Sequence, residues 1–204
     1  MDKNKRLEIF FDSIIVLIVI LLYIFVGMFL YTDFRERKRN EISKDIIKKV
    51  DEKIENTEEI IPEENGINTQ YSGINYTVIG KIRVKKIGIY QPILKENTKA
   101  AYDASAVKMS GPNLNTNGNV AIGGHNFMRG RFFIKINKLV NNDVITITDL
   151  SGDSVDYYVY EYGIRSIDDV SYLAQPDDPS LRIVTLVTCT KGGKERYYVK
   201  AKAK

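Results

Sequence analysis

The sequence predicts an all-β domain, a closed barrel of seven or eight strands with short helices, that follows an N-terminal transmembrane helix and a charged stalk. One observation is the segment 13–31, in which 19 consecutive residues carry no charge and most are apolar. A second is the change near Asn75, where short runs rich in Val, Ile, Tyr and Thr begin to alternate with Gly, Asn and Asp. Seven or eight such runs in about 130 residues favour a barrel or a sandwich. We therefore predict a cytoplasmic tip with a membrane anchor over 1–32, a charged helical stalk or linker over 33–74, and the barrel domain over 75–204.

The anchor segment is long enough to cross a bilayer. At 1.5 Å per residue, a helix of this length spans about 28 Å, close to the thickness of the hydrocarbon layer. A buried core helix is seldom apolar on every face. The segment is also longer than the apolar part of a cleaved signal peptide, and no A-x-A-like site follows it. We predict membrane contact through residues 13–31, although lysines and arginines at both ends leave the orientation open on charge alone.

The predicted stalk is dense in charge and carries one apolar stripe on a narrow helical face. This stripe consists of Ile42, Ile46, Ile47, Val50 and Ile54. Pro62 and Gly66 then end the helical pattern. Two interpretations are open: a solvated stalk, or a stripe that packs on the domain or pairs with a second chain.

The predicted strands of the barrel are short and bounded by turn-forming residues. They are Val78–Val84, Ile87–Leu94, Asn119–Ile122, Val144–Leu150, Ser154–Tyr162, Leu181–Cys189 and Arg196–Ala201. The run from Asp143 to Asp149 alternates polar and apolar residues, as a half-buried strand does. Short helical turns are predicted within 101–109, within 132–139 and from Ser171 onward.

The composition excludes several classes of function. A net charge of +4 is too small to indicate nucleic-acid binding, so we predict no nucleic-acid partner. The 204 residues include one cysteine and one histidine. An internal disulfide and a metal site built from several histidines are therefore excluded. Any mechanism that needs an imidazole has to use His125.

Three residues carry functional groups at exposed strand ends. Cys189 ends an apolar strand before the flexible turn Lys191-Gly-Gly-Lys, which gives a thiol access to solvent. His125 follows two glycines at the end of another strand. Arg196 lies seven residues after Cys189, on the adjacent strand if the two form a hairpin. Taken singly, each also fits a structural role: a small buried hydrophobe, a histidine in a surface turn, or a solvated strand charge.

Together these residues resemble the signature of the sortase family. Sortases carry a T-L-x-T-C motif at a strand end, an arginine on the following strand, and a histidine after a glycine at the end of an earlier strand. The same pattern occurs here as Thr185-Leu-Val-Thr-Cys189, Arg196 and His125. The order of anchor, linker and barrel is also similar, and the resemblance covers the anchor and the region from Asn75 to Lys204.

The resemblance implies a sortase-type barrel and a membrane-anchored cysteine transpeptidase of a Gram-positive cell. Such an enzyme cleaves an LPxTG-like sorting signal between Thr and Gly through a thioacyl-enzyme, then transfers the surface protein to an amine of a cell-wall precursor. Cys189 would be the nucleophile, His125 the proton donor and acceptor, and Arg196 the residue that stabilises the oxyanion. The protein would be single-pass, with its N-terminus in the cytoplasm and its catalytic domain outside the cell.

Further site residues are predicted from their position in the sequence, and a subgroup is predicted from missing segments. The segment between Tyr162 and Leu181 would line a substrate groove. The predicted substrate-binding residues are Ile167, Val170, Tyr172 and Leu173 of this segment, together with Thr188 of the T-L-V-T-C motif. The sequence has neither an N-terminal Asp-Pro-aromatic lid nor a second C-terminal span, which favours an anchoring sortase, with class D as the candidate subgroup.

No metal site and no cofactor are predicted. Some sortases bind calcium through loop carboxylates, and the loop acids of this chain are Glu96, Asp103, Asp168 and Asp169. They form no dense acidic cluster in the sequence, and calcium binding is left open.

Other functions fit the sequence less well. Papain-like enzymes place the cysteine before the histidine, and caspase-like enzymes need a Q-A-C-x-G motif that is absent here. The alternative from a different class is a membrane-anchored β-barrel binding module without catalytic activity.

Overall fold

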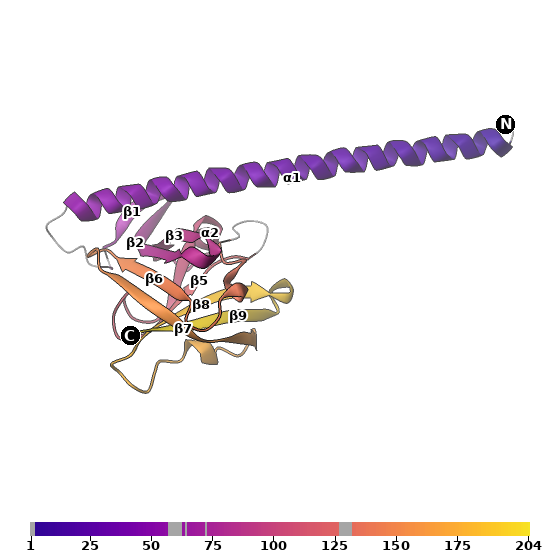
Figure 1. The fold of residues 1–204 in the computed structure, drawn as a ribbon. Helices are drawn as coiled ribbons and strands as arrows, with labels where there is room; N and C mark the ends of the chain where they lie inside the picture. The colour runs from indigo at the N-terminus through magenta and orange to yellow at the C-terminus, as the bar shows by residue number, and fades with distance from the viewer. Residues whose placement is uncertain (1–2, 57–62, 64, 72, 127–131) are drawn as a thin grey trace. The chain divides into compact units, whose positions relative to one another are not determined.

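The computed structural model describes residues 3–56, 63, 65–71, 73–126 and 132–204 (Figure 1). The chain divides into two compact units, Met1–Arg39 and Asn40–Lys204. A long helix, α1 (Lys3–Asn56), belongs partly to each. The candidate functional residues all lie in the second unit.

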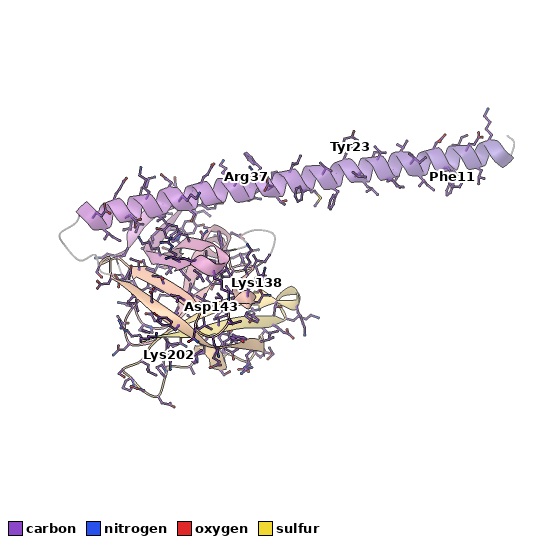
Figure 2. The ribbon with its side chains drawn as sticks, viewed as in Figure 1. Phe11, Tyr23, Arg37, Lys138, Asp143 and Lys202 are labelled. Carbon is purple, nitrogen blue, oxygen red and sulfur yellow. The ribbon has the colours of Figure 1, made fainter. Side chains whose placement is uncertain are left out.

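The first unit is the apolar part of α1. Leu7–Arg35 is the one helical stretch within the described residues that is long and apolar enough to cross a membrane. Its apolar side chains are exposed all along the helix, including Phe11 and Tyr23, which project from the helix in Figure 2. The predicted anchor 13–31 lies inside this stretch. A helix that is apolar on every face is typical of a membrane span.

The second part of α1 packs on the barrel, so the structure shows the packed form of the isoleucine stripe. Ile46, Ile47 and Val50 are at most 8% exposed. Ile46 and Val50 share an apolar cluster with residues of the barrel wall such as Val78 and Leu94. Polar contacts flank the cluster: Ser43 Oγ donates a hydrogen bond to Gln91 Oε1 at 2.7 Å, and Lys81 pairs with Asp51.

Among the described residues, nine strands form one sheet, and eight of them close into a barrel. The strands are β1 (Ile67–Tyr71), β2 (Ile74–Val84), β3 (Ile89–Leu94), β4 (Ala106–Ser110), β5 (Gly118–Gly123), β6 (Val144–Asp149), β7 (Ser154–Ser166), β8 (Arg182–Thr190) and β9 (Glu195–Ala203). Their order is β1-β2-β3-β4-β5-β8-β9-β7-β6, and a second pairing of β2 with β6 closes the ring. β1 attaches to β2 outside the ring. The predicted closed all-β barrel of seven or eight strands is confirmed.

The interior of the barrel is apolar. Its cluster includes Ile82, Ile122, Ile147 and Leu186, none of which is measurably exposed. Alternate residues of each strand point inward, because successive side chains of a strand face opposite sides of the sheet. The residues between them face outward, and on β5, β8 and β9 they include the candidate site.

The short helical elements lie where turns were predicted, but one strand was not predicted. The predicted helical turn within 101–109 is a helix, α2 (Lys99–Ala104), followed by the unpredicted strand β4. β4 pairs with β3 through two register positions, Ile93 with Ala106 and Leu94 with Val107, and with β5 through three. The predicted turns at 132–139 and at Ser171 are 3₁₀ turns, η2 (Ile136–Lys138) and η3 (Ser171–Leu173).

Candidate active site

The first candidate side chain, Cys189, lies at the end of β8 beside the end of β5. These strands are parallel, and Gly123 is in register with Val187. Beyond that point Gly124 N donates to Val187 O at 3.1 Å, and Thr188 Oγ1 donates to Gly124 O at 2.6 Å. These bonds fix the backbone immediately before His125. The side chain of the next residue, Asn126, donates a hydrogen bond to the carbonyl oxygen of Cys189.

Arg196 reaches the same place from the other side of β8. The turn Lys191–Gly193 joins β8 to β9, and its three residues have positive φ angles of 46°, 67° and 92°. Two of the three are glycines, which adopt such angles without steric cost. Cys189 and Arg196 are cross-strand partners, as hairpin geometry predicted. Arg196 Nη1 donates to Gly193 O at 2.8 Å and to Glu195 O at 3.1 Å, so the turn itself orients the guanidinium.

A cavity of about 220 Å³ joins these residues. Its lining consists of Tyr102, Met109, Gly123, Gly124, His125, Val187, Thr188, Cys189 and Arg196. The predicted Cys–His–Arg set and Thr188 therefore surround one space. Cys189 is partly exposed, so it is not the small buried hydrophobic residue that was considered as its other role.

The two glycines before His125 are needed for close packing. A Cβ atom on Gly123 would lie 2.7 Å from a ring carbon of Tyr102 and 2.8 Å from the sulfur of Met109. A Cβ atom on Gly124 would lie 2.6 Å from the ring of Phe133. All three distances are far below normal contact distances, so larger residues here would displace the neighbouring side chains, two of which line the cavity.

α2 places two residues beside His125 that were not predicted as site residues: Tyr102, which lines the cavity, and Asp103. The Tyr102 ring faces the His125 ring, with centroids 5.6 Å apart and an interplanar angle of 47°. Burial raises the pKa of Tyr102 to about 12; the nearby Cys189 adds to this increase and Arg196 opposes it. Tyr102 is therefore a neutral phenol at physiological pH. Asp103 Oδ1 lies 3.5 Å from His125 Nε2.

The segment predicted to bind substrate packs on β8 and β9, where it contacts Val187 of the cavity lining. Tyr172 is only 4% exposed; it packs with Val187 and stacks on Tyr198 at a centroid distance of 5.4 Å. Leu173 packs against the same cluster, while Ile167 and Val170 are about half exposed. None of the four lines the cavity. Their role in substrate binding stays a prediction.

A buried polar network holds this segment in place. Asn119 is 1% exposed, and its side-chain nitrogen donates to the carbonyl oxygens of Tyr172 and Ala174, each at 3.1 Å. Thr185 Oγ1 donates to Asn119 Oδ1 at 2.7 Å. Gln175 forms two further bonds with the Asn119 backbone. The two threonines of the T-L-V-T-C motif therefore fix two different neighbours of the cavity: Thr185 the covering segment and Thr188 the histidine strand.

The structure offers no cluster for a metal ion in the part that it describes. No group of three or more His, Cys, Asp and Glu side chains converges among these residues. The loop acids take part in separate contacts: Glu96 accepts hydrogen bonds from Thr77 N, and Asp169 pairs with Arg165.

Comparisons with known proteins agree with this geometry. The family model of the sortase domain matches residues 82–204. Sortase A of Bacillus anthracis is 28% identical over 131 residues, which are 60% of this chain and 58% of that protein; the match thus spans little more than half of the relative's length. The structure of a sortase D5 transpeptidase of Clostridium perfringens is 29% identical, with a TM-score of 0.66, and the match covers 80% of this chain and 99% of that one. A lid mutant of sortase A from Corynebacterium diphtheriae shares the fold, with 18% identity, a TM-score of 0.58, and coverage of 81% and 95%.

Proposed function

The chain belongs to the sortase family, and from this premise we propose that it is a membrane-anchored cysteine transpeptidase that attaches surface proteins to the cell wall. The single observation that carries the proposal is the cavity lined by Cys189, His125 and Arg196. A nucleophile, a proton carrier and a fixed cation around one space are the groups that acyl transfer requires.

In the first step, the Cys189 thiolate attacks the carbonyl carbon of the scissile peptide bond. The new S–C bond turns the carbonyl into a tetrahedral oxyanion. When the C–N bond breaks, the C-terminal part of the substrate leaves as an amine, and the N-terminal part stays on Cys189 as a thioester. An incoming amine then attacks the thioester carbon, and breakage of the S–C bond restores the thiolate.

His125 carries the proton in both half-reactions. The imidazolium gives its proton to the departing amine, and the neutral ring accepts one from the incoming amine, so each cycle returns the enzyme to its starting state. Imidazole suits both directions because its ordinary pKa lies near neutrality. The position of His125 in the cavity wall beside Cys189 supports this role.

Arg196 stabilises the oxyanion of both tetrahedral intermediates. The guanidinium is planar and permanently charged, and donors that are oriented before the reaction stabilise a developing negative charge most effectively. Its hydrogen bonds to the carbonyl oxygens of Gly193 and Glu195 supply that orientation in the absence of substrate.

The proposed substrate is an LPxTG-like sorting signal cleaved between Thr and Gly, and the proposed acceptor is an amine of a cell-wall precursor. The resemblance of the T-L-V-T-C motif supports this substrate class. The likeness to a sortase D5 transpeptidase supports class D as the subgroup. The apolar helix Leu7–Arg35 supports a single span, and we propose that the N-terminus is cytoplasmic and the barrel outside the cell.

A transfer assay with hydroxylamine tests the proposal. The full chain in detergent is mixed with an LPxTG peptide and hydroxylamine, which traps the acyl group as a peptide hydroxamate. Wild-type protein should form the hydroxamate, and Cys189→Ala should form none while keeping its fold. The matched control is Thr190→Ala, the next residue of β8, which lies outside the cavity lining and should keep activity. Full cleavage by Cys189→Ala, or retained peptide binding by a wild-type protein that forms no product, would refute the proposal and favour a binding module.

A further inference from the structure

The helix α2 is positioned to act on His125. Thr98 Oγ1 caps its start by accepting a hydrogen bond from Ala101 N at 3.2 Å, and Ala101 is fully buried. At its end, Ser105 N donates to Ala101 O at 2.9 Å, and Ser105 Oγ donates to Pro92 O at 2.7 Å. Thr98 thus caps the start of this short helix, and Ser105 ties its end to β3 of the barrel. The two residues near its end, Tyr102 and Asp103, therefore have defined positions beside the imidazole.

We propose that Asp103 is a positioning residue for His125: its carboxylate holds one edge of the imidazole and stabilises the protonated ring, so that the other edge is directed to the reacting groups. The role of this pair in catalysis rests on the proposed function. It adds a fourth side chain to the Cys–His–Arg set. Asp103 touches neither the peptide nor the sulfur in this scheme and acts only through His125.

The geometry supports this role. Asp103 Oδ1 and His125 Nε2 are 3.5 Å apart, and the two side chains are 37% and 32% exposed, so the pair is partly shielded from water. The Tyr102 ring lies beside the imidazole, with centroids 5.6 Å apart and the two planes tilted by 47°. One helix thus places a charge and an aromatic ring next to His125.

The charges around the pair have opposing effects. Asp103 and a Cys189 thiolate favour the imidazolium, whereas Arg196, in the wall of the same cavity, disfavours it. Tyr102 stays neutral because its pKa is about 12. Burial and then the Asp103 carboxylate raise the pKa of Tyr76, so this phenol stays neutral too. Loss of the carboxylate therefore removes one charge that favours the imidazolium.

The sign of the effect follows. A nearby carboxylate raises the pH at which an imidazole loses its proton, so Asp103→Asn should make His125 titrate at lower pH than in the wild type. Because both side chains are about one-third exposed, water screens the interaction, and we expect a shift of about 0.5 pH unit. Asp103→Glu keeps the charge and should restore part of the shift.

A histidine titration by NMR tests the pairing without any assay of activity. The chain has a single histidine, so one ¹³C-labelled imidazole signal reports His125 unambiguously. The full chain in detergent micelles is titrated as wild type, Asp103→Asn and Asp103→Glu. The control is Asp156→Asn on β7, whose carboxylate accepts a hydrogen bond from Thr146 instead. A shift to lower pH in Asp103→Asn alone supports the pairing; curves of wild type and Asp103→Asn that coincide overturn it.

The pH profile of kcat/KM tests whether Asp103 acts in catalysis through His125. The limb that reports His125 should move to lower pH in Asp103→Asn by the same amount as the NMR titration, with KM changed by less than about 3-fold. A purely structural role would lower the rate at every pH without moving the limb and would overturn the inference. If the NMR shift appears but the wild type forms no hydroxamate, the proposed function fails while the pairing stands. If hydroxamate forms but neither readout shifts, the proposed function stands and the role of Asp103 fails.

Discussion

The wall formed by β5, β8 and β9 has two faces that are built from different interactions. The inner face presents Val120, Ile122, Val184, Leu186 and Val199, all at most 3% exposed, to the apolar interior. The outer face presents Asn119, Thr185, Cys189 and Arg196, which are fixed by hydrogen bonds or line the cavity. The two sets alternate along the same strands.

This difference separates stability from function within one piece of sheet. Burial of apolar area is non-directional, so the inner face tolerates changes of shape at a cost in folding free energy. The outer face depends on particular donors and acceptors in particular places. Substitutions at neighbouring positions of one strand should therefore produce different kinds of defect.

The largest effect on stability is expected at the inner face. Leu186→Ala removes a fully buried side chain next to Thr185 and should lower the free energy of unfolding by about 2–5 kcal/mol. The control, Leu186→Met, nearly conserves volume and should cost less than about 1.5 kcal/mol. Denaturant unfolding measures both. A loss below about 1 kcal/mol in Leu186→Ala would contradict a tightly packed interior at this position.

The next largest effect concerns turnover. Arg196→Lys keeps the charge but loses the planar donors, so kcat should fall on the order of 100-fold while KM changes by less than about 3-fold. The control is Arg165, the cross-strand partner of Arg196 on β7. Arg165→Lys makes the same substitution outside the cavity lining. Steady-state kinetics of both variants measure the contrast. Equal kcat in wild type and Arg196→Lys would remove Arg196 from the catalytic set.

A smaller effect is expected from the buried polar network. Thr185→Val keeps the shape but removes the donor to Asn119 Oδ1, and the loss of a buried hydrogen bond should cost about 1–3 kcal/mol. Thr146→Val is the matched control, since Thr146 Oγ1 donates to Asp156 in an exposed bond and should cost little. Denaturant unfolding compares the two. Similar losses in both variants would show that burial of the Asn119 network adds no stability.

The smallest effect is expected in the first unit. Deletion of residues 1–31 removes only the apolar part of α1 and leaves Ile46, Ile47 and Val50 on the barrel. The remaining chain should be soluble and should unfold within about 0.5 kcal/mol of the full chain in detergent. Deletion of residues 1–56 removes the packed stripe as well and should be clearly destabilising. A short deletion that produced an unfolded protein would mean that the apolar helix is part of the fold.

The sequence predicted what depends on local pattern. The strand at Val144–Asp149 followed from its alternation, and the barrel from the number of such runs. The sequence brought Cys189, His125 and Arg196 together as a set only through the motif resemblance. Their separations of 64 and 7 residues contain no distance information without the β5–β8–β9 register.

The sequence did not predict what depends on tertiary contact. Asp103 was recognised only as a loop acid, because nothing local to α2 indicates that it lies beside His125, 22 residues later. β4 was missed because its strand form requires β3 and β5 as neighbours. The stripe on α1 was visible, but its partner on the barrel was not.

The most direct test of the central claim is the intact mass of the protein after brief mixing with an LPxTG peptide. The cavity geometry predicts an added mass equal to the acyl part of the peptide, located on Cys189, the only cysteine of the chain, and removed by added hydroxylamine. Cys189→Ala should show no adduct. Cleavage of the peptide by wild-type protein with no adduct on Cys189, even after rapid acid quenching, would contradict a thioacyl intermediate.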